Sequence, residues 1–273
     1  MTTQAREVRD TPSSIQAPAP NRAADNQRNR SRLTALLGGG RASRPNRLPD
    51  RYHERWRDAF DIRVQPSLVA GVRILDVGSG RTPTIPPDQR PEGCWYAGLD
   101  LSIAELQRAP EGSYNEMHVA DVAHRVPELE GRFDLIVSWQ VLEHVKPLDA
   151  ALENLQSYLR SGGRLVAQFS GRYSAFGLIN MVVPQELGVR LMQQLLGRDP
   201  DTVFPAYYNR CWHQALQPLS SAWSSWRILP RYRGGRYFQF SSMLQRIYIS
   251  YEEWVIRGHR HNLATHYIIV GEK

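Results

Sequence analysis

A glycine turn after a short apolar segment is the first feature of the sequence whose residues suit ligand chemistry. The stretch RILDVGSGRTP (residues 73–83) runs from strand-forming residues into Gly78-Ser79-Gly80. Such a turn lets the backbone approach a ligand closely, and many nucleotide-binding folds begin this way. A dinucleotide fingerprint needs a third glycine where Pro83 stands, and a P-loop needs a lysine after the turn. Both phosphate-binding interpretations are weakened, and the Asp76 carboxylate would repel a phosphate but attract a cation.

Segments of strand and helix character alternate along the chain, and these elements must position the glycine turn. Five segments carry strand-forming residues, and they lie near 73–77, 95–99, 115–119, 133–138 and 163–169. The segments between them can form helices, so the pattern predicts a parallel sheet covered by helices on both faces. The helix before the fifth strand has a leucine stripe, and we expect it to end at Gly162-Gly163.

Two further strands are expected near the end of the sequence. Residues 223–235 and 264–273 have strand character and flank a helical segment at 241–259. Pro230 favours an edge position for the first of them, because proline cannot donate a ladder hydrogen bond.

In order and spacing, residues from about 50 to 170 resemble the class I S-adenosylmethionine-dependent methyltransferases. Five stretches carry the resemblance, one at each successive strand: LDVGSG, YAGLDLS, HVADV, FDLIVSWQVLEHV and LRSGGRLVAQF. The resemblance implies an α/β, Rossmann-like class I methyltransferase fold with a mixed seven-stranded sheet and helices on both faces. It also implies S-adenosyl-L-methionine as the cofactor.

The resemblance assigns cofactor-binding roles to residues at the strand ends. Gly78, Ser79 and Gly80 would approach the amino-acid end of the cofactor, which Asp76 would support directly or through water. Asp100, with Leu101 beside it, would accept hydrogen bonds from both ribose hydroxyls. Asp121 would bind the adenine amino group, and the backbone of Val122 would donate to the ring. Taken singly, an aspartate in such a place is as often a helix cap or a turn residue.

The segment after the fourth strand is the expected place of methyl transfer. Ser138, Trp139 and Gln140 would wall that pocket as part of the cofactor site. His144 is the candidate general base, since histidine titrates near neutral pH, although it would equally serve to orient the loop. Ubiquinone-type O-methyltransferases carry a metal-binding acid at the position of Gln140, so we expect no required metal here.

Residues 170–205 form an insertion that we interpret as the acceptor site or a lid. Leucines and a methionine between 187 and 196 predict an apolar helix face, which would pack as a lid or line a groove for an apolar acceptor. Tyr207, Tyr208 and Arg210 are the candidate substrate-binding residues. These side chains suit a planar or sugar-like acceptor, and equally a crowded helix junction.

The N-terminal residues differ from the rest in composition. Residues 1–45 are rich in Pro, Ala, Ser, Asn, Gln and Arg and predict a disordered basic tail before a methyltransferase domain at 46–273. Much of the net charge of +7 lies in this tail, so basicity is weak evidence for a nucleic-acid partner. Order is expected to begin where Tyr52, Trp56 and Phe60 predict one helix face, on the core or over a ligand mouth.

Other features indicate the compartment. No signal peptide or membrane-spanning run is evident, and the two cysteines, Cys94 and Cys211, lack any metal-ligand spacing. We therefore expect a cytoplasmic protein.

Three functional classes follow. The leading one is an enzyme that methylates a small molecule, a saccharide or a lipid-linked intermediate, with oxygen as the expected atom. The second is a methyltransferase acting on nucleic acid or protein, to which the basic tail would be attracted. The third, a non-catalytic protein that binds the cofactor or a partner, is disfavoured by the intact glycine turn and acidic residues.

Overall fold

The computed structural model describes residues 48–174, 177–178 and 206–273. The expected tail at 1–45, most of the expected insertion at 170–205 and its apolar helix face lie outside the described residues. The proposed boundary between tail and domain therefore stays a prediction.

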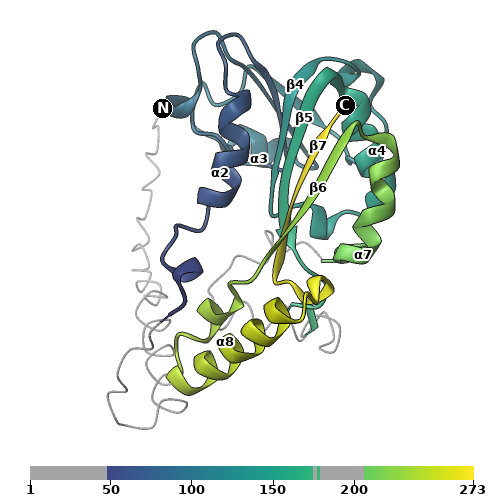
Figure 1. Cartoon of the computed structure of the whole chain (residues 1–273). Coiled ribbons are helices and arrows are strands. Elements are labelled where there is room, and N and C mark those ends of the chain that lie inside the picture. The colour runs from purple at the N-terminus through teal and green to yellow at the C-terminus, as the bar shows by residue number, and fades with distance from the viewer. Residues whose placement is uncertain (1–47, 175–176, 179–205) are drawn as a thin grey trace, which may run out of the picture.

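A seven-stranded mixed sheet forms the centre of the described structure (Figure 1). The strand order is β3-β2-β1-β4-β5-β7-β6; β1 to β5 pair in parallel, and β7 pairs antiparallel with both β5 and β6. The strands are β1 (Arg73–Val77), β2 (Trp95–Asp100), β3 (Glu116–Val119), β4 (Phe133–Trp139), β5 (Leu159–Ser170), β6 (Ser225–Arg231) and β7 (His266–Glu272). This confirms the predicted fold class, and Pro230 lies on the edge strand β6 as expected.

Helices cover both faces of the sheet. The α-helices are α2 (Asp58–Val64), α3 (Ile103–Gln107), α4 (Leu148–Tyr158), α7 (His213–Leu216) and α8 (Ser242–Arg257). In Figure 1, α2 lies against one face, α4 and α7 lie against the other, and α8 lies beyond the end of the sheet where β4 and β5 finish. We call that end the carboxyl edge. Each face has its own buried core, because side chains of a strand point alternately to the two sides: Ile74 faces the α2 side, and Leu75 faces the α4 side.

Short 3-10 turns supply several connections. They are η1 (Asp50–Tyr52), η2 (Gln65–Ser67), η3 (Pro87–Gln89), η4 (Pro127–Leu129), η5 (Leu142–His144), η7 (Gln217–Ala222), η8 (Gly234–Phe238) and η9 (His261–Leu263).

Three local expectations were wrong. The β1–β2 and β3–β4 connections contain only η3 and η4 instead of α-helices, and in the first the closely spaced prolines from 83 to 91 oppose a helix. Tyr52 lies in η1, and α2 begins only at Asp58, so the three aromatic residues do not share one helix. α4 ends at Tyr158, before Gly162, which lies within β5 with a φ of 76°.

Two further findings concern expected absences. Among the described residues, no helix is long and apolar enough to cross a membrane. Cys94 and Cys211 are both free thiols. The cytoplasmic location stays a prediction.

Candidate active site

The glycine turn lies at the carboxyl edge, between the ends of β1 and β4. Gly78 and Gly80 have φ values of 72° and 49°, a region that glycine enters without strain. A Cβ atom added at Gly78 would lie 2.4 Å from Cγ2 of Val141, in the segment that follows β4. The backbone at Gly78 is therefore held by its conformation and by a close neighbour, and a side chain there would not fit.

Asp76 points into the interior, where it anchors the connection between β1 and β2. It is fully buried, and its Oδ2 accepts hydrogen bonds from the Thr84 N–H and the Tyr96 hydroxyl, each at 2.6 Å. Its other oxygen, Oδ1, has no hydrogen-bond partner. Burial raises the pKa of Asp76 to about 6, although Tyr96 and Thr84 act to lower it. The expected support of a cofactor's amino-acid end by Asp76 stays a prediction.

Asp100 lies beside the glycine turn, at the end of β2. A Cβ atom added at Gly80 would be 3.5 Å from Oδ2 of Asp100, so this carboxylate and the turn are neighbours. Asp100 is half-buried and accepts a hydrogen bond from the Ser102 N–H at 3.0 Å. Burial raises its pKa, while backbone N–H groups of Ser102, Gly80 and Leu101 oppose that rise. Leu101 itself is exposed.

Tyr114 was not among the predicted site residues, but its hydroxyl group contacts the glycine turn. Its hydroxyl oxygen lies 2.6 Å from Oγ of Ser79 and 2.8 Å from the carbonyl oxygen of Gly80. Its ring packs over Gly98 of β2, where an added Cβ would lie 2.7 Å from a ring carbon. The local sequence gave no signal for this contact, because Tyr114 and Ser79 are 35 residues apart.

Asp121 follows β3 and makes a local turn. Its Oδ1 accepts a hydrogen bond from the Ala123 N–H at 2.9 Å, and its carbonyl accepts one from the His124 N–H. Val122 is buried, and its carbonyl accepts a hydrogen bond from Asn154. The turn uses one carboxylate oxygen of Asp121, and the adenine-binding role of this residue stays a prediction.

The three residues expected to wall the pocket have different environments. Ser138 is buried and donates to the Val77 carbonyl at 3.2 Å, which ties β4 to the end of β1. Trp139 packs edge-on against Phe60 on the α2 face, with ring centroids 4.9 Å apart. Gln140 has a φ of 59°, and its Oε1 accepts a hydrogen bond from the Ser170 hydroxyl at 3.1 Å.

His144 and the candidate acceptor residues meet beyond the end of β4. His144 ends η5, and the Tyr208 N–H donates to the carbonyl of the preceding residue, Glu143, at 2.9 Å. Tyr208 is buried, whereas Tyr207 is exposed. Arg210 forms an ion pair with Asp149, with an N–O distance of 3.4 Å. Tyr208 therefore belongs to the same neighbourhood as His144, while Tyr207 and Arg210 lie nearer the surface.

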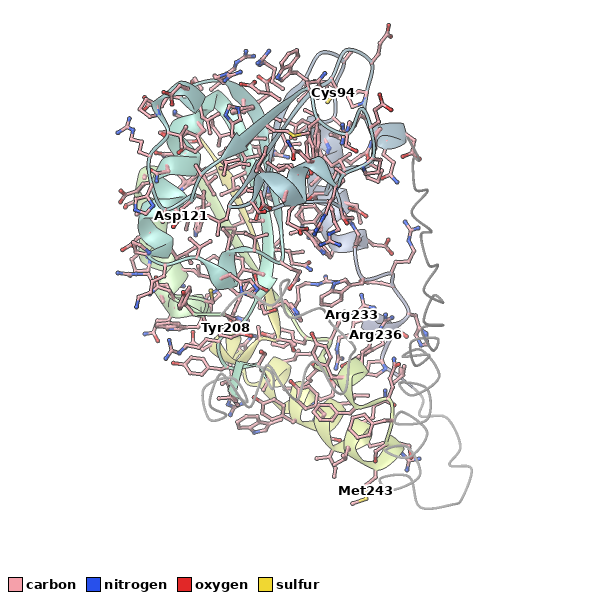
Figure 2. The ribbon with its side chains drawn as sticks, turned by 180° about the vertical axis from the view of Figure 1, so that it is seen from behind. Cys94, Asp121, Tyr208, Arg233, Arg236 and Met243 are labelled. Atoms are coloured by element: carbon pink, nitrogen blue, oxygen red, sulfur yellow. The ribbon has the colours of Figure 1, made fainter. Side chains whose placement is uncertain are left out.

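The carboxyl edge also contains polar residues that the sequence analysis did not select. Figure 2 shows two of them, Arg233 and Arg236, with Tyr208 near this end of the molecule and Cys94 at the opposite end. Glu143 is buried there, and its Oε1 accepts a hydrogen bond from the Ser170 N–H at 3.2 Å. Its position next to His144 was the only sequence signal for it.

The residues of the turn fit the cofactor that the resemblance implied. The bare backbone at Gly78 and Gly80, with a half-buried carboxylate beside it, is compatible with an amino acid and a ribose at this edge, and the roles of the individual residues stay predictions. Within the described ranges, no group of three His, Cys, Asp or Glu side chains is placed to hold a metal ion. The expectation that no metal is required stays a prediction.

Comparisons with known proteins agree with this geometry. A family model described as a methyltransferase domain matches residues 25–239, which is more than half of the chain. The chain therefore belongs to this methyltransferase family, whose class I fold serves S-adenosylmethionine-dependent methyl transfer.

Curated relatives match the chain over shorter stretches. A ubiquinone biosynthesis O-methyltransferase of Chelativorans sp. is 30% identical over 113 residues, which cover 40% of this chain and 44% of the relative. The ubiquinone biosynthesis O-methyltransferase of Xanthomonas axonopodis pv. citri is 29% identical over 150 residues, which cover 53% of this chain and 60% of the relative. The chain spans about half the length of the curated relatives it matches.

Among solved structures, a SAM dependent methyltransferase from Archaeoglobus fulgidus is similar to this chain. It is 17% identical, with a TM-score of 0.47, and the match covers 82% of this chain and 97% of that one.

Proposed function

We propose that this chain is a methyltransferase that moves a methyl group from S-adenosylmethionine to an oxygen atom of a small molecule. The observation that supports it best is the juxtaposition of the Gly78–Gly80 turn with Asp100 at the carboxyl edge. Open α/β sheets bind their ligands at this edge, near the point where the strand order reverses. That point lies between β1 and β4, where the turn is found. The names of the curated relatives favour oxygen as the methylated atom.

Four groups of this chain have defined tasks in the proposed cofactor site. The backbone at Gly78 and Gly80 binds the amino-acid end of the cofactor, and the Asp100 carboxylate binds the ribose hydroxyls. Asp121 binds the adenine amino group. When bound, S-adenosylmethionine supplies a methyl group that is already activated for transfer. The protein's main tasks are therefore to hold the acceptor in line and to keep water out.

A hydroxyl acceptor must also lose a proton. His144 follows β4 at the carboxyl edge, and in this proposal an imidazole nitrogen of His144 accepts that proton. Tyr208 and Arg210 bind the acceptor on the outer side of the same segment. A saccharide or a lipid-linked intermediate remains within the proposed acceptor range, and the proposed location is the cytoplasm.

Two measurements test the proposal. Calorimetry should detect binding of S-adenosylhomocysteine to the full chain, and a protein that fails to bind it would contradict the proposed function. Methyl-labelled S-adenosylmethionine should then label a small hydroxyl compound from a panel that includes catechols and sugars. Removal of residues 1–45 should leave this turnover unchanged. Label that entered only nucleic acid or protein, with dependence on the tail, would instead support a macromolecular acceptor.

A further inference from the structure

Unsatisfied polar atoms are concentrated at the carboxyl edge, around the ends of β4 and β5. Four side chains there are buried or half-buried, and each has one buried polar atom that makes no hydrogen bond. They form what we call the carboxyl-edge cluster: Gln140, Glu143, Gln168 and His266. The unpaired atoms are Nε2 of both glutamines, Oε2 of Glu143 and Nδ1 of His266. Buried polar groups in native proteins are nearly always paired, so such a concentration requires an explanation.

Hydrogen bonds and strand pairing join the cluster into one site. Ser170 is its centre: its hydroxyl donates to Gln140, its N–H donates to Glu143, and its β7 partner in the ladder is His266. Gln168 lies two residues before Ser170 on the same face of β5, and its carbonyl accepts a hydrogen bond from the Gln140 N–H at 2.7 Å. The four side chains therefore surround the ends of three neighbouring strands.

The unpaired atoms define the chemistry of a complementary ligand. The two unpaired amide nitrogens can only donate, and the unpaired Glu143 carboxylate oxygen accepts. Burial lowers the pKa of His266 to about 3, so its ring is neutral and its Nδ1 donates or accepts according to its tautomer. A hydroxyl group both donates and accepts, so hydroxyl groups satisfy this mixed set.

Charged ligands suit the cluster less well. A phosphate or carboxylate would be repelled by Glu143, and an ammonium group would leave both amide donors unpaired. Arg233 is a buried cation at this end of the molecule, and its two Nη atoms already donate to the backbone carbonyls of Tyr52, Glu54 and Arg55. Its Nε has no partner and is a further donor, which a hydroxyl oxygen can satisfy. The observations therefore favour a neutral ligand.

We propose that the carboxyl-edge cluster is a subsite that binds hydroxyl groups of a neutral, polyhydroxylated acceptor. The proposal rests on the proposed function and narrows its acceptor to a chemical class. Aromatic rings border the cluster: the Trp56 ring centroid lies 4.7 Å from that of His266, and Trp139 is the ladder partner of Gln168. Such a border suits the flat face of a catechol or a sugar ring.

Calorimetry on the full chain saturated with S-adenosylhomocysteine tests the proposal with defined probes. Catechol and methyl α-D-glucopyranoside carry neighbouring hydroxyls, whereas 1,2-dimethoxybenzene has the catechol shape without donors. We expect at least one hydroxylated probe to bind, and the dimethoxy compound to bind at least about tenfold more weakly. Gln168→Met and Glu143→Gln should each weaken binding of the hydroxylated probe by about tenfold or more, since each removes one partner.

The control is Gln65→Met, the same change at an exposed residue just after α2, which should leave probe binding unchanged. Thermal unfolding separates binding from packing: Gln168→Met should keep or raise the melting temperature, because it removes an unpaired buried amide. The proposal would be overturned if the wild-type protein bound neither hydroxylated probe, or if both cluster variants bound the probe as tightly as the wild type does. Either result would leave the proposed function intact. If S-adenosylhomocysteine itself does not bind, the proposed function fails, and the subsite fails with it.

Discussion

The Tyr96 hydroxyl donates a hydrogen bond to Oδ2 of Asp76 at 2.6 Å, and both residues are shielded from solvent. The same hydroxyl oxygen accepts a hydrogen bond from the Ile85 N–H at 3.0 Å. The pair thus holds two backbone groups of the proline-rich connection, since Asp76 also accepts from the Thr84 N–H. In place of a helix after β1, a buried polar pair fixes the path of the chain beside the glycine turn.

Asp76→Asn should alter the pH dependence of stability. Burial raises the pKa of Asp76 from 3.8 to about 6, so between these values the folded protein binds more protons than the unfolded chain. Stability from this group therefore falls as pH rises from about 4 to 6, by at most about 3 kcal/mol, and the penalty persists above that window. The asparagine variant should lack this slope and be at least as stable at pH 8. Urea unfolding at pH 5, 6 and 8 checks this, and an unchanged slope in the variant would refute it.

Gly78→Ala should displace the backbone of the glycine turn, because it adds a steric clash to the backbone strain. The new Cβ would meet the Val141 side chain at 2.4 Å, and a φ of 72° costs a non-glycine residue about 1–3 kcal/mol. Gly112→Ala is the matched control, because its φ is 75° and no atom lies within 4 Å of the added Cβ. We expect only Gly78→Ala to weaken binding of S-adenosylhomocysteine, by at least about tenfold, as the displaced backbone would no longer fit the ligand. Equal effects of the two variants on calorimetric affinity would argue against a binding role for the turn.

Asp100→Asn should weaken cofactor binding without unfolding the protein. The carboxylate is proposed to accept hydrogen bonds from two ribose hydroxyls, and an amide keeps only one acceptor oxygen. Loss of a hydrogen bond to a charged group predicts an affinity for S-adenosylhomocysteine that is lower by about tenfold or more. Asp88→Asn, at an exposed residue of η3, should bind as the wild type does. If Asp100→Asn bound S-adenosylhomocysteine as tightly as the wild type, Asp100 would not be the residue that binds the ribose.

His144→Ala should lower turnover by about 10²-fold or more if the imidazole accepts the acceptor's proton. Binding of S-adenosylhomocysteine should persist, because the residue lies beyond the proposed cofactor contacts. His53→Ala, at an exposed histidine, provides the control. Full turnover in His144→Ala would leave His144 only a role in orienting the loop.

Tyr52→Phe should destabilise the end of the molecule that carries α8. The Tyr52 hydroxyl donates to Oε2 of buried Glu252 at 2.5 Å and accepts from the Gly235 N–H at 2.8 Å. Removing it leaves two buried groups without this partner, so we expect a loss of about 1–3 kcal/mol in the free energy of unfolding. Tyr207→Phe, at a half-exposed tyrosine, should cost far less. Similar losses in both variants by denaturant unfolding would contradict this account.

The sequence predicted the strands well, since buried parallel strands are continuous apolar runs with polar residues at their ends. The segment expected at 73–77 is β1, and the predicted strand ends placed Gly78 and Asp100 at one edge. This works because such signals are local: a strand former, a glycine and an acid within a few residues. The order of the parallel strands then brings their ends together.

Contacts between distant segments explain what the sequence did not reveal. Tyr52 was expected on one helix face with Phe60, but it contacts Glu252, 200 residues later. Gln168 and His266 become neighbours only because β7 inserts beside β5, and no local period indicates that pairing. The interior position of Asp76 depends on a hydrogen bond from Tyr96, on another strand, and no local pattern indicates that contact.

The placement of β7 between β5 and β6 affects how the protein is made. β6 emerges from the ribosome before β7, yet it can join the sheet only through β7. The 34 residues between Arg231 and His266 take on the order of seconds to translate. Throughout that interval β5 offers nascent chains an open strand edge, which is the kind of surface that chaperones shield and that pairs wrongly between crowded polysomes.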